Sequence, residues 1–286
     1  MLVLLIAACS SYSVLPRQPL SILLQTDRYA VVSKPPGVVV HRNKYSPDGE
    51  EPLLQRVRDQ LGKHVHAVHR LDGGTSGCVL FAFDSTTTST LQAAMTGDSA
   101  QKTYLALVRG DASRIQNTIV DRPIKDERGT VREARTHLHC VASCSDDLAE
   151  RSSLILATPS TGRWHQIRKH LNGISHPIIG DAKHGDSRVN RWWRQERDMR
   201  HLGLHCVQLK LPIPDQDMIN VRCPVRPDLV DVFKSLPWWD AACEELPDLR
   251  SDSILAVRAR ALQAATEDPL NRAAAAGRSL ITFHRR

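Results

Sequence analysis

Long apolar runs are absent from this sequence of 286 residues, since no stretch of about 18 uninterrupted apolar residues occurs in it. This absence excludes a bilayer-spanning helix, and with it a transporter or a membrane receptor. Extremes of composition are absent too: hydrophobic residues make up 41% and charged residues 24%, with 15 Gly and 16 Pro. The chain is therefore neither collagen-like nor disordered as a whole, and it can form one large mixed α/β unit or two domains.

A paired set of cysteines is also lacking. The chain has seven cysteines, an odd number scattered over its whole length, which argues against a disulfide framework and for a reducing compartment. Only Cys140 and Cys144 lie close together, and no second pair stands at metal-ligand spacing. We therefore predict buried thiols, no structural zinc and no other metal site.

The N-terminus lacks the Lys or Arg that a signal peptide carries before its apolar run. Residues 6–9 resemble a bacterial lipobox, but export fits a chain with seven cysteines poorly. A wrongly chosen start codon and a degenerate organelle-targeting leader both stay open. Residues 1–20 are therefore expected to be a leader or a disordered segment, and the expected location is the cytoplasm, or an organelle if a leader is present.

Positive charge gathers in two segments. The formal net charge is +7, and residues 163–200 carry a net +5 while residues 250–286 carry a net +4, so the rest of the chain is slightly acidic. Such a local excess is typical of a face that binds a polyanion, because phosphates are bound locally. The alternative is a pair of solvated helix faces, which is the usual origin of charged runs.

Short β-rich runs between turn signals dominate the chain from residue 21 onward. They predict strands over residues 22–24, 29–33, 65–68, 79–83, 104–108, 135–141, 153–158 and 202–211. Apolar spacing predicts helices over 51–61 and 164–171, with a short one between residues 83 and 104 and with Asn172-Gly173 as the C-cap after residue 171.

Strands thus outnumber helices, and no regular βαβ alternation appears. We predict an α+β fold, with a mixed, mostly antiparallel central sheet and flanking helices. The composition becomes rich in Ala and Arg after Trp239. A catalytic domain is therefore expected over residues 21–240 and a basic C-terminal extension over residues 241–286.

The first group of residues suited to chemistry follows the predicted strand at 65–68 and reads His69-Arg70-Leu71-Asp72-Gly73-Gly74-Thr75-Ser76-Gly77. An Asp before two glycines is a common hairpin turn, and Asp72 could serve only that purpose. A turn, however, needs neither the Arg nor the His that precede it. A carboxylate kept ionised and aimed at a substrate does need nearby donors, so Asp72 is a candidate catalytic carboxylate.

The second group lies on the predicted helix at 164–171 and in the segment after it. The two stretches read Thr161-Gly162-Arg163-Trp164-His165-Gln166-Ile167-Arg168-Lys169-His170-Leu171 and His176-Pro177-Ile178-Ile179-Gly180-Asp181. Arg168 falls at the edge of the buried stripe formed by Ile167 and Leu171, where a guanidinium needs a carboxylate partner. Asp72 is the predicted partner, and a weak surface salt bridge along the helix is the alternative.

The third group is Lys102-Thr103-Tyr104, which opens a strand. Taken alone, Tyr104 would most often be a core residue. Together, however, the three groups resemble the RluA-type family of RNA pseudouridine synthases in order and spacing over about residues 20–235. Residues 34–37, Lys-Pro-Pro-Gly, match a further turn of that family, and residues 178–186 most resemble its tRNA pseudouridine synthase C subgroup.

The resemblance implies an isomerase that needs no cofactor and acts as a monomer on RNA, with tRNA the first expectation and rRNA the second. By this resemblance Asp72 is the catalytic carboxylate, Arg168 pairs with it, and Tyr104 stacks on the uracil. Arg70 would fill the space left by the extruded base. The other residues expected to contact the substrate are His69, Lys102, Arg163, His165 and Gln166.

Two departures and two rival functions accompany this interpretation. The family commonly has Lys or Arg where Gly73 stands, and Gly where Ser175 stands, which affects substrate preference rather than activity. A metal hydrolase is suggested by His201 and His205, but no carboxylate completes a zinc motif there. The other rival is a non-catalytic RNA-binding paralogue. The presence of Asp72, Tyr104 and Arg168 argues against it.

Overall fold

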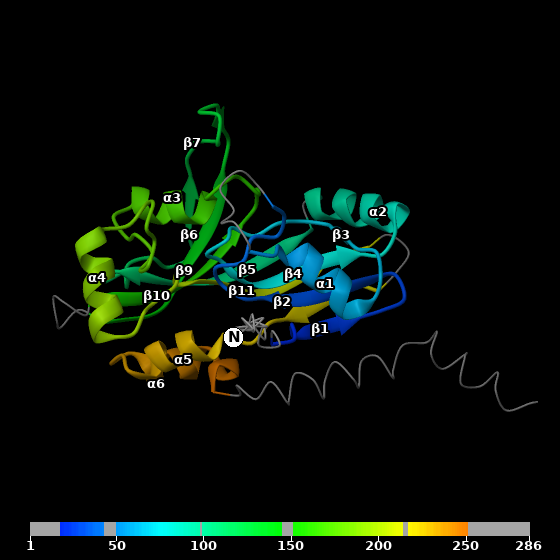
Figure 1. The fold of residues 1–286 in the computed structure, drawn as a ribbon. Coiled ribbons are helices and arrows are strands. Elements are labelled where there is room, and N and C mark those ends of the chain that lie inside the picture. Colours follow the sequence, from blue (N-terminus) through cyan, green and yellow to red (C-terminus); the bar gives the residue numbers. More distant parts are fainter. Residues whose placement is uncertain (1–17, 43–49, 98, 145–150, 214–216, 251–286) are drawn as a thin grey trace, which may run out of the picture.

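The computed structural model describes residues 18–42, 50–97, 99–144, 151–213 and 217–250, so the predicted leader and most of the basic extension lie outside the described residues. The described chain forms a mixed sheet of ten strands with helices on both sides (Figure 1). The main path of the sheet has the order β1-β2-β4-β11-β5-β10-β9-β6, while β12 pairs with β11 and β3 pairs with β4.

The strands keep the predicted order, with changes at their ends. Those foreseen are β1 (Ile22–Gln25), β2 (Tyr29–Lys34), β3 (His66–Ala67), β4 (Ser76–Ala82), β5 (Gln101–Arg109), β9 (Arg135–Cys144), β10 (Ser152–Pro159) and β11 (Leu204–Leu211). Those not foreseen are β6 (Thr118–Asp121), β7 (Ile124–Lys125), β8 (Val131–Arg132) and β12 (Ile219–Arg222). These four are short and flanked by charged residues, so they have little of the apolar pattern that predicts a strand.

The central sheet contains a single parallel pair among the described strands, β4 with β11, and the remaining pairs are antiparallel. Gly77 pairs with Cys206 there and has φ +113°, and a Cβ on it would lie 2.2 Å from the Cys206 carbonyl oxygen. The glycine of the Thr-Ser-Gly motif is therefore required by this close strand approach. The predicted α+β architecture is confirmed.

Helices cover both faces of the sheet. They are α1 (Leu53–Leu61), α2 (Ser85–Thr96), α3 (Gln166–Gly173), α4 (Ser187–Glu196), α5 (Pro227–Lys234) and α6 (Trp239–Glu245), followed by the short 3₁₀ turn η1 (Pro247–Leu249). Figure 1 shows α5 and α6 below the sheet and α3 above it, with the β7–β8 hairpin projecting at the top. The sheet thus separates two hydrophobic cores, one of which holds α5, α6 and the buried Trp193 of α4.

The limits of two elements differ from the sequence predictions. Helix α3 begins at Gln166 rather than at Trp164, because His165 adopts a left-handed backbone with φ 56° and ends the preceding loop. The prediction of Asn172-Gly173 as the C-cap is wrong: both residues are helical, and Ile174 follows as the cap. Helix α6 crosses residue 240, and Ala242 and Leu249 are buried, so packing continues beyond the expected end of the catalytic domain.

Candidate active site

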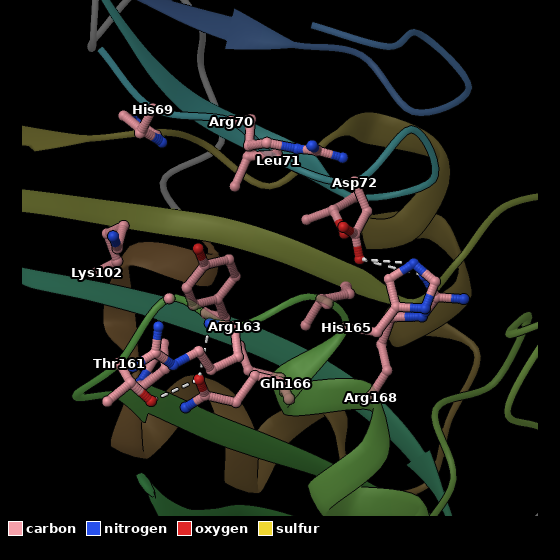
Figure 2. Close-up of a pocket in the computed structure, with 16 residues that line it drawn as sticks. His69, Arg70, Leu71, Asp72, Lys102, Thr161, Arg163, His165, Gln166 and Arg168 are labelled. Carbon is pink, nitrogen blue, oxygen red and sulfur yellow. Dashed lines mark hydrogen bonds and ion pairs between the residues drawn. The ribbon is translucent and has the colours of Figure 1, made fainter. Parts of the chain in front are cut away.

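One pocket of about 270 Å³ collects the residues that the sequence singled out. Its lining includes all nine of them, namely His69, Arg70, Asp72, Lys102, Tyr104, Arg163, His165, Gln166 and Arg168. They come from the loop between β3 and β4, from β5, from the turn that leads from β10 into α3, and from the first residues of α3 itself. Figure 2 shows Asp72, His165 and Arg168 grouped on one side of the pocket, and His69 and Lys102 on the other.

The predicted pair of Asp72 and Arg168 is present. Arg168 Nη1 lies 3.2 Å from Asp72 Oδ2, and the two side chains are 10% and 21% exposed, so this is not the surface salt bridge held as the alternative. The loop that carries Asp72 is fixed from behind by Lys34. The Lys34 ammonium is fully buried and donates hydrogen bonds to the carbonyl oxygens of Pro35, Val38 and Gly73.

Asp181 is a site residue that the sequence analysis quoted but did not assign. Its carboxylate accepts two hydrogen bonds of 2.7 Å from Arg168, one from Nε and one from Nη2, and two more from the backbone N–H groups of Lys183 and His184. Burial is the largest single influence and opposes the charge of Asp181, but the hydrogen bonds and charge of Arg168, together with the two backbone N–H groups, outweigh it and lower the pKa of the carboxyl. The sequence held a signal for this second partner of Arg168, because a guanidinium predicted to lie at the edge of a buried stripe has donors for two carboxylates.

The aromatic and cationic side chains of β5 are held in low-polarity surroundings. Burial, followed by the negative groups around it, raises the pKa of Tyr104 well above its ordinary value, so the phenol stays protonated. Burial also lowers the pKa of the Lys102 ammonium. The pocket therefore offers an uncharged aromatic ring and a poorly solvated cation near one carboxylate, which suits a base with an adjacent phosphate.

Two histidines of the pocket are neutral at physiological pH. Burial lowers the pKa of His69 to about 3, and its Nε2 accepts the N–H of Leu80 at 3.2 Å, which leaves the proton on Nδ1. Burial, with the charge of Arg168 next, lowers the pKa of His165 to about 3 as well. His165 Nε2 lies 3.6 Å from Asp72 Oδ2, too far for a hydrogen bond.

Gln166 uses the whole hydrogen-bonding capacity of its amide within the protein. Its Oε1 accepts from Thr161 Oγ1 at 2.7 Å and from the Arg163 N–H at 3.0 Å. Its Nε2 donates to Arg135 O and Thr136 Oγ1. Two donors and two acceptor sites are all that a carboxamide has, so Gln166 fixes the turn at 161–163 against β9.

Arg70 stands at the mouth of the pocket. Its side chain is 63% exposed, and its Nη2 lies 3.6 Å from Glu127 in the β7–β8 hairpin. An ion pair this exposed contributes little stability and breaks readily. The Arg70 guanidinium is therefore held only weakly at the pocket mouth.

The two described histidines that suggested a metal hydrolase, His201 and His205, are not among the residues that line the pocket. Within the described ranges, no group of three or more His, Cys, Asp and Glu side chains is placed to hold a metal ion. His205, which suggested a hydrolase, is buried, and its Nδ1 shares a 2.8 Å hydrogen bond with Ser76 Oγ. The described helices include none long and apolar enough to cross a membrane.

Comparison with known proteins agrees with this geometry. The family model described as RNA pseudouridylate synthase matches residues 28–173. A tRNA pseudouridine synthase C of Vibrio vulnificus (strain CMCP6) is 32% identical over 235 residues, which are 77% of this chain and 96% of that protein. Another, of Yersinia pestis, is 36% identical over 212 residues, or 68% of this chain and 82% of that protein.

Solved structures lead to the same family. Human RNA Pseudouridylate Synthase Domain Containing 1 aligns with a TM-score of 0.56 at 25% identity, covering 73% of this chain and 86% of that one. Human RNA Pseudouridylate Synthase Domain Containing 4 shares the fold with a TM-score of 0.58 at 23% identity, covering 79% and 93% of the two chains. By sequence and by fold, the chain belongs to the RNA pseudouridylate synthase family.

Proposed function

We propose that this chain isomerises a uridine of tRNA to pseudouridine in the pocket around Asp72. The observation that carries the proposal is a carboxylate inside a 270 Å³ pocket, held by an arginine that a second, buried carboxylate fixes in place. Relatives that span most of this chain are named tRNA pseudouridine synthase C, which favours tRNA as the RNA.

The reaction exchanges one glycosidic bond for another. The bond from N1 to C1′ of the ribose breaks, the uracil turns in place, and C5 bonds to C1′ while C5 loses a proton and N1 gains one. Asp72 acts at the ribose, either by attack on C1′ or by removal of the 2′ proton. Arg168 pairs with that carboxylate and fixes its orientation, and Tyr104 stacks on the uracil as an uncharged ring.

The uridine must leave its stack to reach Asp72. Arg70, exposed at the pocket mouth, is proposed to occupy the space that the base leaves. His69, Lys102, Arg163, His165 and Gln166 line the pocket and are proposed to shape the substrate site, Gln166 through the turn that it fixes. The net +5 of residues 163–200 supplies counter-charge for phosphates.

Three further expectations belong to the proposal. A monomer is proposed as the acting species, and the oligomeric state in solution tests this. The cytoplasm is the proposed location, since the reducing compartment expected from the cysteines also holds tRNA. The catalytic domain is proposed to begin near residue 21 and to include α6, with residues 251–286 as a basic extension.

The test is Asp72→Asn, which keeps the shape of the side chain and removes its charge. Bulk tRNA from cells that lack the gene is incubated with the protein, and pseudouridine is measured by mass spectrometry of nucleosides. Wild type should form pseudouridine, the variant should form none, and both should bind tRNA alike. Asp59→Asn, an exposed change on α1, is the matched control.

Several outcomes would contradict the proposal. Wild-type turnover by Asp72→Asn would remove the carboxylate from the mechanism. If the wild type bound tRNA without forming pseudouridine, the non-catalytic paralogue would be favoured. If it formed pseudouridine on rRNA alone, rRNA would take the place of tRNA as the substrate. Loss of activity on addition of EDTA, restored by stoichiometric zinc, would point to the metal hydrolase.

A further inference from the structure

Two imidazoles are hydrogen-bonded to each other at the edge of the pocket. His165 Nδ1 lies 2.8 Å from His184 Nε2, and the rings meet edge to face with centroids 5.0 Å apart and an interplanar angle of 87°. His165 lines the pocket, whereas half-buried His184 lies behind it, in the segment that follows Asp181. The pair thus joins the space beside Asp72 to the region outside the pocket lining.

His165 is held in place at a cost. Its left-handed backbone, with φ 56°, is uncommon for a residue other than glycine, and such strain is frequent at functional sites. The ring of Trp164 stacks on the imidazole with centroids 4.1 Å apart and an angle of 24°. The ammonium groups of Lys169 and Lys183 lie 4.1 Å and 4.4 Å from the centroid of that indole. The orientation of His165 is therefore fixed by packing and does not depend on bound RNA.

Burial, ahead of the charges around the pair, keeps both rings neutral. Arg168, Lys183 and Lys169 face the pair on the positive side, and Asp72 and Asp181 on the negative side. Burial lowers the pKa of both imidazoles, and the cations add to this effect. A neutral pair has one N–H between the rings, which leaves an unprotonated nitrogen at one end and an N–H at the other.

The direction of this hydrogen bond follows from the distance to Asp72. A protonated His165 Nε2 would donate to the carboxylate at about 2.7–2.9 Å, but the atoms are 3.6 Å apart. The arrangement that fits has the proton on His165 Nδ1, donated to His184 Nε2. The lone pair of His165 Nε2 then faces the pocket beside Asp72.

The reaction needs an acceptor for the proton on C5, and the other pocket groups are less suited to this step. Tyr104 stays protonated, because burial raises its pKa. Asp72 acts at the ribose in the proposed function, and its Oδ2 already accepts a hydrogen bond of 3.2 Å from Arg168 Nη1. We propose that His165 accepts the C5 proton of the turned uracil and that His184 passes a proton on to solvent.

This proposal rests on the proposed function and balances within it. Once C5 has bonded to C1′, N1 and C6 share a double bond. The C5–H bond then breaks, its electron pair forms the C5–C6 double bond, the N1–C6 π pair moves to N1, and the proton goes to His165 Nε2. The negative charge on N1 is neutralised by a proton from solvent. The proton on His165 Nδ1 moves to His184 Nε2, and His184 releases the proton on its own Nδ1. His165 is thus a catalytic residue, and His184 is a relay residue behind it. N1 is protonated separately, so no oxidant, metal or cofactor enters the step.

The experiment measures single-turnover rates on a tRNA transcript that the wild type modifies, with hydrogen or deuterium at C5 of its uridines. Removing a general base should slow the chemical step, so His165→Gln should lose roughly 10²-fold in rate. His184→Ala should lose less, and its backbone N–H still bonds to Asp181. In both variants the deuterium isotope effect should exceed that of the wild type, because C5 deprotonation becomes slower. His137→Gln, an exposed change on β9, should alter neither quantity.

Chemical rescue separates the relay from a structural role. Added imidazole should raise the rate of His184→Ala and should leave His137→Gln unchanged. Wild-type rates in both variants, or slower variants with an unchanged isotope effect and no rescue, would overturn the relay while the wild type still forms pseudouridine. A wild type that forms none on any RNA would instead refute the proposed function, so the two failures are distinguishable.

Discussion

At the scale of single residues, the site depends on how one guanidinium is shared between two carboxylates. Arg168 directs Nε and Nη2 at buried Asp181 and keeps Nη1 for Asp72. Asp181 is saturated by Arg168 and two backbone N–H groups, so it can serve as an anchor. Asp72 has the longer bond and the greater exposure, which leaves it able to meet a substrate.

This division of roles predicts the effect of Asp181→Asn. An amide keeps the shape of the side chain but loses the charge that holds Arg168. Arg168 should then fix the orientation of the Asp72 carboxylate less well. We expect the single-turnover rate to fall by at least about tenfold, since breaking a buried charge pair costs about 3–5 kcal/mol. Asp186→Asn is the control, because Asp186 also accepts backbone N–H groups in the next turn but lies at the surface. An equal loss in both variants would show a general effect of the loop.

His69 predicts a pH dependence of stability. Its pKa is about 3 in the folded protein and 6.5 for an ordinary histidine side chain. Between pH 3 and pH 6.5 the unfolded chain therefore binds more protons than the folded one. The free energy of unfolding should therefore fall as the pH is lowered from 6.5 towards 3. In His69→Gln this loss between about pH 7 and about pH 5 should be smaller by roughly 1–2 kcal/mol, as measured by urea unfolding. An unchanged pH dependence would contradict the burial of a neutral His69.

At the scale of elements, the start of α3 decides the shape of the pocket. His165 has a left-handed backbone conformation, which ends the preceding turn and lets the helix begin at Gln166. Hydrogen bonds of Gln166 connect that turn to β9. These two residues bring Arg163, His165 and Arg168 to one pocket from a stretch of six residues. A straight helix from residue 164, as the spacing predicts, would place His165 on a regular helical face instead.

Gln166→Ala tests this element. The change removes the hydrogen bonds that the buried Gln166 amide makes to Arg135, Thr136 and Arg163, which should cost about 1–3 kcal/mol of unfolding free energy. Activity should fall as well, because the same turn carries pocket residues. Gln116→Ala removes an exposed amide and should change neither quantity. Loss of activity with no loss of stability would mean that Gln166 acts on the substrate directly.

At the scale of the whole molecule, the sheet works as a partition between two cores. The core on the side of α5 and α6, the helices below the sheet in Figure 1, continues to Leu249. The pocket is lined by the loop between β3 and β4, by β5 and by the start of α3. Leu249 is the last buried residue of the described chain, so the packed body reaches at least this residue, and a basic extension beyond it stays a prediction.

Two truncations test this division. Removing residues 241–286 takes Ala242, Cys243 and Leu249 out of the core and should destabilise the fold by several kcal/mol, since losing one large core side chain costs about 2–5 kcal/mol. Removing residues 251–286 should leave stability and the saturating single-turnover rate unchanged. If the extension contacts phosphates, the log-log salt slope of RNA binding should flatten by about 0.7–0.9 per lost contact. Equal stability of the two truncations would contradict the position of Leu249.

By itself the sequence determined the reaction class, the sheet architecture and the membership of the pocket. Asp72, Tyr104 and Arg168 were identifiable because motifs of specific residue types in a fixed order carry chemistry locally. The strands were identifiable wherever apolar residues dominate a short run, and the short charged strands β6, β7, β8 and β12 were missed for the same reason.

Only the tertiary structure decided which groups meet. Asp181 is 109 residues from Asp72 in the chain, and Arg168 joins them from α3, which packs against β9 and β10. The His165–His184 hydrogen bond likewise spans 19 residues and depends on a backbone angle that no local preference favours. Such contacts are set by long-range packing, which compensates for local strain and burial, and neither effect appears in the residue pattern of one segment.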